Sequence, residues 1–145
     1  MREEPIVILL AEDDPDHVEL IRRGLQHDPV ASRVMHVSDG EAALDYLFRR
    51  GAYSIEALSP RPHIVLLDLR LPKVDGLDVL RQVKESSLGG LPIIILSTSD
   101  ATSDVARAYE LRANSYLVKP LDFSSFSAML QSLGLFWLRW NEPLR

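Results

Sequence analysis

The sequence predicts an α/β domain in which a parallel sheet of five strands is covered by helices on both faces. Five short apolar runs recur along the chain, and stretches with apolar residues at helical spacing separate them. Unbroken apolar runs of this length are typical of strands buried on both faces, as in a parallel sheet. Alternation of such strands with helices is the pattern of a doubly wound fold, whose right-handed crossovers leave few possible strand orders.

The predicted strands are the apolar runs themselves. The run at 34–37 is the weakest, because it is short and contains His36. Residues 50–62 carry glycine, serine and proline and predict a longer surface loop before the third strand. In chain order, the runs are Ile6–Ala11, 34–37, Ile64–Leu67, 93–96 and Ser115–Val118.

A helix signal follows each predicted strand. Pro15 suits the first turn of a helix that runs to about residue 27. Ser38 and Glu41 have the spacing of a capping box at the start of the second helix. Further helices are expected over 76–85, after a cap at Asp100 or Thr102, and from about Asp122 onward.

The composition is that of an ordinary soluble globular protein. The chain has 145 residues, 46% of them hydrophobic and 26% charged, and this length suits one domain. The net charge is -5 and basic residues form no long block, so direct binding of nucleic acid is not expected. Cysteine is absent, which excludes disulfides and thiolate metal sites. No apolar stretch reaches the roughly 18 residues of a membrane span, so we expect a cytoplasmic protein without membrane contact.

Acidic residues stand where two of the predicted strands end. Glu12 and Asp13 follow the first strand, and Asp68 follows the third. The carboxyl ends of parallel strands share one edge of the sheet, and α/β sheets place their sites in a crevice there. Oxygen ligands without histidine or cysteine favour Mg²⁺, with Mn²⁺ as a second possibility. Asp14, before Pro15, is expected to start the helix rather than to bind metal.

The same edge carries the groups that phosphoryl transfer requires. Asp68 is a candidate nucleophile, because aspartate carboxylates form acyl phosphates. Lys119 follows the fifth strand and supplies a cation for the phosphoryl oxygens, and the Ser97 hydroxyl follows the fourth strand. The histidines have no ligand spacing among themselves and are expected to be structural or solvent-facing.

These motifs together resemble the receiver family of two-component response regulators, over about residues 5–133. The resemblance implies a flavodoxin-like sheet with strand order 2-1-3-4-5. The motifs that carry it are Glu12-Asp13, Asp68-Leu69-Arg70-Leu71-Pro72 with Asp75-Gly76, Ser97-Thr98-Ser99, Tyr116, and Lys119-Pro120.

The resemblance also implies the chemistry of the site. Asp68 would accept a phosphoryl group from a phosphohistidine of a sensor histidine kinase. The metal ligands would be Glu12, Asp13, Asp68 and the backbone carbonyl of Arg70. Glu12 departs from the more usual aspartate, and Arg70 places a long cation beside the site.

The resemblance implies a switch as well. Lys119 would pair with the phosphoryl group, Ser97 would move toward it, and Tyr116 would swing inward behind Ser97. In the family the bond before Pro120 is cis, which is plausible because cis peptides are largely confined to X–Pro bonds.

The chain continues past the expected domain, 1–133, with a distinctive segment at 134–145. Aromatic and leucine residues recur at helical steps from Phe123 to Trp140, which predicts an extended last helix. Projecting apolar side chains usually mark an interface, so Phe136, Trp137 and Trp140 are expected to form a homodimer contact. The segment resembles the tail of stand-alone receivers that serve phytochrome-type histidine kinases.

Three other functions fit the sequence less well. A phosphatase of the haloacid dehalogenase type needs a second aspartate two residues after the nucleophile, where this chain has Arg70. A flavodoxin needs a hydroxyl- and glycine-rich loop after the first strand, where the acids at 12–14 would repel phosphate. An adaptor that is never phosphorylated would not need a lysine and a hydroxyl beside Asp68. The sequence therefore favours a single-domain response regulator without an output domain, whose only chemistry is self-catalysed phosphotransfer and dephosphorylation.

Overall fold

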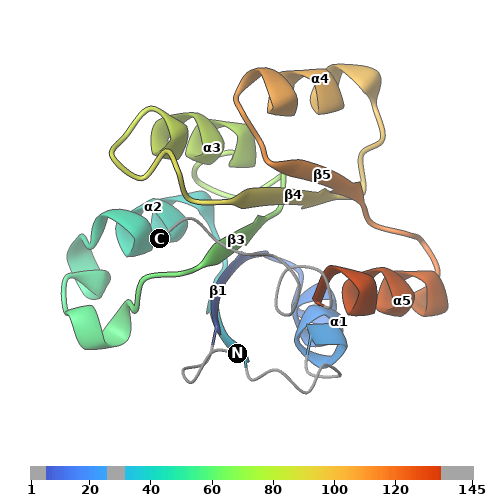
Figure 1. Cartoon of the computed structure of the whole chain (residues 1–145), viewed down its shortest axis with the longest axis horizontal. Helices are drawn as coiled ribbons and strands as arrows, with labels where there is room; N and C mark the ends of the chain where they lie inside the picture. The colour runs from blue at the N-terminus through green and yellow to red at the C-terminus, as the bar shows by residue number, and fades with distance from the viewer. Residues whose placement is uncertain (1–5, 26–31, 135–145) are drawn as a thin grey trace.

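The computed structural model describes residues 6–25 and 32–134, which form one five-stranded parallel sheet with helices on both faces (Figure 1). The strand order is β2-β1-β3-β4-β5, so β3 is central and the predicted flavodoxin-like order is confirmed. All neighbouring strands are parallel. The strands are β1 (Ile6–Ala11), β2 (Ser32–Val37), β3 (Ile64–Leu67), β4 (Ile93–Ser97) and β5 (Ser115–Val118).

Five α-helices cover the two faces of the sheet in the described part of the chain. Helices α1 and α5 lie side by side on one face, and α2, α3 and α4 cover the other (Figure 1). The helices are α1 (Pro15–Leu25), α2 (Gly40–Phe48), α3 (Gly76–Lys84), α4 (Thr102–Glu110) and α5 (Phe123–Gly134).

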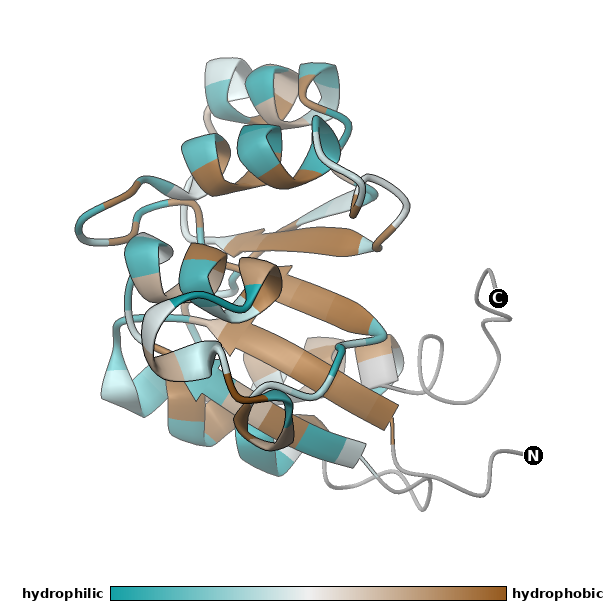
Figure 2. Cartoon of the chain, turned by 90° about the vertical axis from the view of Figure 1, so that its left-hand side faces the viewer, coloured by the Kyte–Doolittle hydropathy of each residue, from teal (hydrophilic) through white to brown (hydrophobic). Residues whose placement is uncertain are grey.

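The core consists of two apolar layers, one on each side of the sheet. Alternate strand residues point to opposite faces. In β1, Ile8 and Leu10 therefore pack toward α1 and α5, whereas Leu9 packs toward α2 and α3. Figure 2 shows that the inner strands are hydrophobic along their length and that the colour of the helices changes from one side to the other. Each fully buried aliphatic side chain contributes about 1.5–3 kcal/mol, so this double burial holds the strands rigidly behind the site.

Two of the predicted helix starts were wrong in detail. Helix α2 is capped by Asp39, whose side chain accepts a hydrogen bond from the Ala42 N–H at 2.7 Å, and not by Ser38. Aspartate is as good an N-cap as serine, and here it stands one residue closer to the helix. Helix α4 follows Ala101 without a side-chain cap, so neither Asp100 nor Thr102 performs that role.

The predicted loop before β3 contains two short 3₁₀ turns, η1 (Gly51–Tyr53) and η2 (Glu56–Leu58). The Tyr46 hydroxyl donates to the Pro60 carbonyl at 2.7 Å, and the buried Ser59 hydroxyl donates to the Tyr53 carbonyl at 2.9 Å. Buried polar groups with partners of this kind give the loop a defined shape.

The last helix is described as far as Gly134. Phe136, Trp137 and Trp140 lie outside the described residues, so the extended helix and its role in dimerisation stay predictions of the sequence. None of the described helices combines the length and apolar character needed to cross a bilayer.

Candidate functional site

The predicted site residues converge at the carboxyl ends of the strands. Asp68 directly follows β3, and its N–H donates to the Ala11 carbonyl at the end of β1, at 3.0 Å. Lys119 directly follows β5, and its N–H donates to the carbonyl of Ser97, the last residue of β4, at 2.7 Å. The strand order reverses between β1 and β3, and ligands bind in the crevice outside such a point.

Three carboxylates form a cluster that suits a divalent cation. Oxygen atoms of Glu12, Asp13 and Asp68 lie within 4.8 Å of one another, as predicted. Glu12 is buried, Asp68 is half-buried and Asp13 is exposed, so the cluster opens to solvent on one side. Hard oxygen ligands in an incomplete shell fit Mg²⁺, which retains several of its waters.

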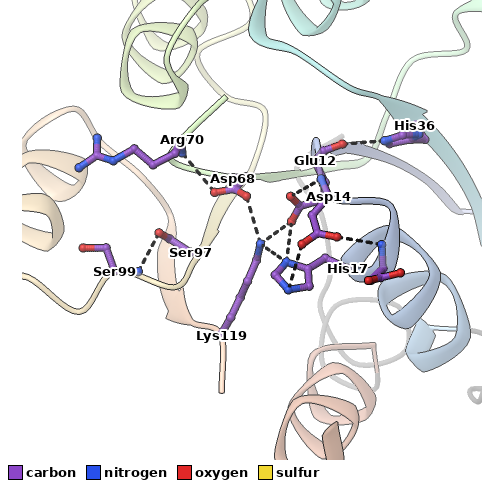
Figure 3. Close-up of polar contacts among 10 residues, drawn as sticks. Glu12, Asp14, His17, His36, Asp68, Arg70, Ser97, Ser99 and Lys119 are labelled. Carbon is purple, nitrogen blue, oxygen red and sulfur yellow. Dashed lines mark hydrogen bonds and ion pairs between the residues drawn. The ribbon is translucent and has the colours of Figure 1, made fainter. Parts of the chain in front are cut away.

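The Lys119 ammonium group lies inside this acidic cluster (Figure 3). Its Nζ donates to Glu12 Oε1 and to Asp68 Oδ2, the latter at 3.1 Å. The side chains of Lys119 and Glu12 are each only 2% exposed. A cation so well desolvated neutralises part of the acidic charge and stands next to the candidate nucleophile.

The electrostatics of Glu12 indicate that the cluster needs positive charge. Burial raises the pKa of Glu12 to about 7, and its contact with Asp68 adds to this rise, whereas Lys119 opposes it. Burial disfavours the ionised form of a carboxyl group. A bound divalent cation would favour that form, so the residues present fit the metal that the sequence predicts.

His17 in α1, which the sequence analysis expected to be structural or solvent-facing, contacts the site. His17 Nδ1 is 3.0 Å from Lys119 Nζ, and its Nε2 is 3.6 Å from Asp14 Oδ2. An ammonium group only donates, so Nδ1 accepts and the other ring nitrogen faces Asp14. No spacing motif predicts this contact, because His17 and Lys119 are 102 residues apart in the chain.

Asp14 performs the structural role expected of it. Its carboxylate accepts a hydrogen bond from the Asp16 N–H at 2.9 Å at the start of α1. This hydrogen bond is the main reason that the pKa of Asp14 lies below its ordinary value.

The two predicted switch residues are joined through Ser99. The buried Ser97 hydroxyl accepts a hydrogen bond from the Ser99 N–H at 3.1 Å (Figure 3). The Tyr116 hydroxyl donates to the Ser99 carbonyl at 2.8 Å, and the Tyr116 ring is half-buried against the core layer beneath α2, α3 and α4. Hydrogen bonds therefore connect Ser97, Ser99 and Tyr116 into one group.

Gly76 gives the loop after Asp68 its shape. A Cβ atom at this position would lie 2.1 Å from the Asp68 carbonyl oxygen and 2.7 Å from that of Leu69. The Gly76 N–H instead donates to the Leu69 carbonyl at 2.9 Å. Only glycine permits so close an approach of α3 to the backbone of the phosphoacceptor candidate.

The expectation of a cis bond before Pro120 was wrong for this structure. The described residues contain no cis peptide bond, and the Lys119–Pro120 bond is trans. The trans form of an X–Pro bond is favoured by about 0.5–1 kcal/mol, and with it Lys119 already reaches both carboxylates.

A comparison with protein families agrees with this geometry. Residues 8–131 match the family described as response regulator receiver domain. The probable methanogenesis regulatory protein FilR2 of Methanothrix harundinacea is 43% identical over 143 residues, which cover 97% of this chain and 88% of that protein. The response regulator Rcp1 of Synechocystis sp. is 38% identical over 135 residues, which cover 92% of this chain and 90% of Rcp1.

Solved structures show the same relationship. The Mn²⁺-bound form of Rcp1 superposes with a TM-score of 0.92 at 36% identity, covering 97% of this chain and all (100%) of that one. The phosphorylated cyanobacterial phytochrome response regulator RcpA also superposes with a TM-score of 0.92, at 34% identity, covering 98% of this chain and 100% of that one. The acidic cluster is the divalent cation site typical of such regulators. The chain belongs to the family of response regulator receiver domains.

Proposed function

We propose that the chain receives a phosphoryl group on Asp68 from a phosphohistidine of a sensor histidine kinase. The observation that carries the proposal is the position of the Lys119 ammonium, 3.1 Å from Asp68 Oδ2 and in contact with Glu12 in the same acidic cluster. A carboxylate beside a desolvated cation, at the end of the central strand, supports this proposal, because phosphoryl transfer needs a nucleophile and positive charge beside the transferred group.

In the proposed transfer, one Asp68 carboxylate oxygen attacks phosphorus, an O–P bond forms, and the N–P bond to the donor imidazole breaks. Lys119 Nζ, which already contacts Asp68, would move with the charge to the phosphoryl oxygens. Glu12, Asp13, Asp68 and the Arg70 carbonyl would hold Mg²⁺ or Mn²⁺, which neutralises charge on those oxygens. No general base is required, because the attacking group is an anion already.

The proposed output is conformational. Ser97 would turn its hydroxyl from the Ser99 N–H toward the phosphoryl group, and Tyr116, which is bonded to the Ser99 carbonyl, would follow. Hydrolysis of the acyl phosphate at the same site would reset the switch, so the chain would catalyse only its own phosphorylation and dephosphorylation. The signal would pass to other proteins through changes in the surface.

The donor kinase is proposed to be of the phytochrome type. Support comes from RcpA, which is described as a phytochrome response regulator, and from the bacteriophytochrome response regulator AtBRR, which is 44% identical to this chain. The homodimer expected through 134–145 belongs to the same proposal.

The test is phosphorylation by acetyl phosphate with Mg²⁺, followed by intact mass. We expect one phosphoryl group on the parent chain and none on Asp68→Asn. Asp78→Asn is the matched control, because it makes the same change at an aspartate in α3 whose ion-pair partner, Arg81, lies outside the acidic cluster. Undiminished labelling of Asp68→Asn would refute the proposal.

A further inference from the structure

Ser99 connects the site to the first turn of α4 through four hydrogen bonds, one of which its hydroxyl accepts from the Ala101 N–H at 3.3 Å. Its N–H donates to Ser97 Oγ at 3.1 Å, and its carbonyl accepts from the Tyr116 hydroxyl at 2.8 Å. Its own hydroxyl donates to Asp104 Oδ2 at 2.6 Å. Asp104 lies in the first turn of α4. The state of the Ser97 hydroxyl is therefore linked to the position of the Asp104 carboxylate.

Asp104 is in turn bound to the loop that follows Asp68. One guanidinium nitrogen of Arg70 lies 3.1 Å and 3.0 Å from the two Asp104 carboxylate oxygens. The Asp104 side chain is 18% exposed and the Arg70 side chain 62%. The Ser99 hydrogen bond, and then Arg70, hold the pKa of Asp104 below its ordinary value, so the pair is ionic at neutral pH. Figure 3 shows the Arg70 side chain extending away from the Asp68 carboxylate.

We propose that the Arg70–Asp104 ion pair is a latch that stabilises the unphosphorylated arrangement of the segment between β4 and α4. The inference rests on the proposed function, because it concerns how the switch responds to a phosphoryl group on Asp68. The latch acts through Ser99. Asp104 and Tyr116 fix the position of Ser99, and in that position the Ser99 N–H donates a hydrogen bond to the Ser97 hydroxyl. The Ser97 oxygen would have to move toward a phosphoryl group on Asp68, and the hydrogen bond that it accepts from the Ser99 N–H opposes that movement.

The latch changes the equilibrium between the two conformations and does not take part in phosphoryl transfer. An interaction made in only one of two states shifts their equilibrium by its own free energy. Arg70 also has a second anionic neighbour, since its Nη1 lies 3.8 Å from Asp75 Oδ1, and phosphorylation would place further negative charge beside it. Arg70 and Asp104 are positioning residues in this scheme. Loss of a partly exposed ion pair corresponds to a shift of about threefold in the equilibrium.

The experiment titrates beryllofluoride, a phosphoryl analogue, in the presence of saturating Mg²⁺ and follows the backbone amide signals of Ser97 and Ser99 by NMR. The variants are Asp104→Asn, which keeps an acceptor for the Ser99 hydroxyl, Arg70→Gln, and the double variant. Asp78→Asn is the matched control, because Asp78 forms a 2.6 Å ion pair with Arg81 within α3, away from Ser99.

We expect each latch variant to lower the half-saturating beryllofluoride concentration by about threefold, and the double variant to add nothing further. Without beryllofluoride, the Ser99 amide signal of Asp104→Asn should already lie partway toward its bound position, with unchanged Mg²⁺ affinity. Asp78→Asn should behave as the parent chain. A purely structural role for Asp104 would leave both the midpoint and the signal unmoved.

Two results would overturn the latch. One is an Asp104→Asn midpoint equal to that of the parent chain. The other is a raised midpoint in Arg70→Gln alone, which would mean that Arg70 attracts the phosphoryl analogue directly. A parent chain that does not bind beryllofluoride at all would instead refute the proposed function, so the two failures are distinguishable.

Discussion

The buried Glu12 carboxyl makes the stability of the metal-free protein depend on pH in an unusual direction. Burial raises its pKa in the folded chain from the ordinary 4.5 to about 7. Between these values the folded chain holds a proton that the unfolded chain has released. The free energy of unfolding therefore falls as pH rises across this window. Most paired carboxylates act in the opposite sense.

The size of the effect follows from the two pKa values. Each pH unit between them corresponds to about 1.4 kcal/mol, so the ionised Glu12 costs on the order of 3 kcal/mol above pH 7. Glu12→Gln removes this cost while it retains the shape of the side chain. We expect Glu12→Gln to be more stable than the parent chain by about that amount near pH 8, and by little near pH 5.

Urea unfolding in a chelator, followed by far-ultraviolet circular dichroism at a series of pH values, measures the difference. Saturating Mg²⁺ should reduce this stability difference, because the cation stabilises only a chain that binds it. At one hundred times Kd this stabilisation is about 2.7 kcal/mol. Glu19→Gln on the exposed face of α1 makes the same chemical change outside the site and is the matched control. A stability difference that stays constant from about pH 5 to about pH 8 would refute the reasoning.

Two further substitutions test the site itself. Lys119→Ala leaves two carboxylates without their ammonium partner, and we expect a loss of about 3 kcal/mol in chelator. Mg²⁺ should still bind this variant, but beryllofluoride should no longer move the Ser99 amide signal; a normal response would remove Lys119 from the mechanism. Gly76→Ala places a methyl group 2.1 Å from the Asp68 carbonyl oxygen, and we expect a loss of about 3 kcal/mol in urea unfolding. Gly51→Ala, where the nearest atom is 3.7 Å away and φ is 55°, should lose only about 1 kcal/mol, and equal losses would contradict the clash.

The strands and the edge of the sheet that carries the site follow from local sequence. Runs such as Ile64–Leu67 are apolar at every position, which only a strand covered on both faces can bury. Once the strands are parallel, the residues after them share one edge, and this places Asp68 near Glu12 and Lys119 without further information. The helix starts do not follow from local sequence alone, because Ser38 and Asp39 are both good caps and packing selects between them.

The sequence by itself determined the fold class, the strand order by resemblance, and which residue types meet at the sheet edge. Only the tertiary structure decided which atoms touch there. The contact of Lys119 with Glu12 joins residues 107 positions apart, and that with His17 joins residues 102 apart. The ion pair between Arg70 and Asp104 spans 34 positions. Such contacts depend on strand spacing, helix placement and side-chain rotamers, which no local pattern encodes. The trans bond before Pro120 is also not encoded locally. The two isomers of an X–Pro bond differ by only about 0.5–1 kcal/mol, so the surrounding fold selects one of them.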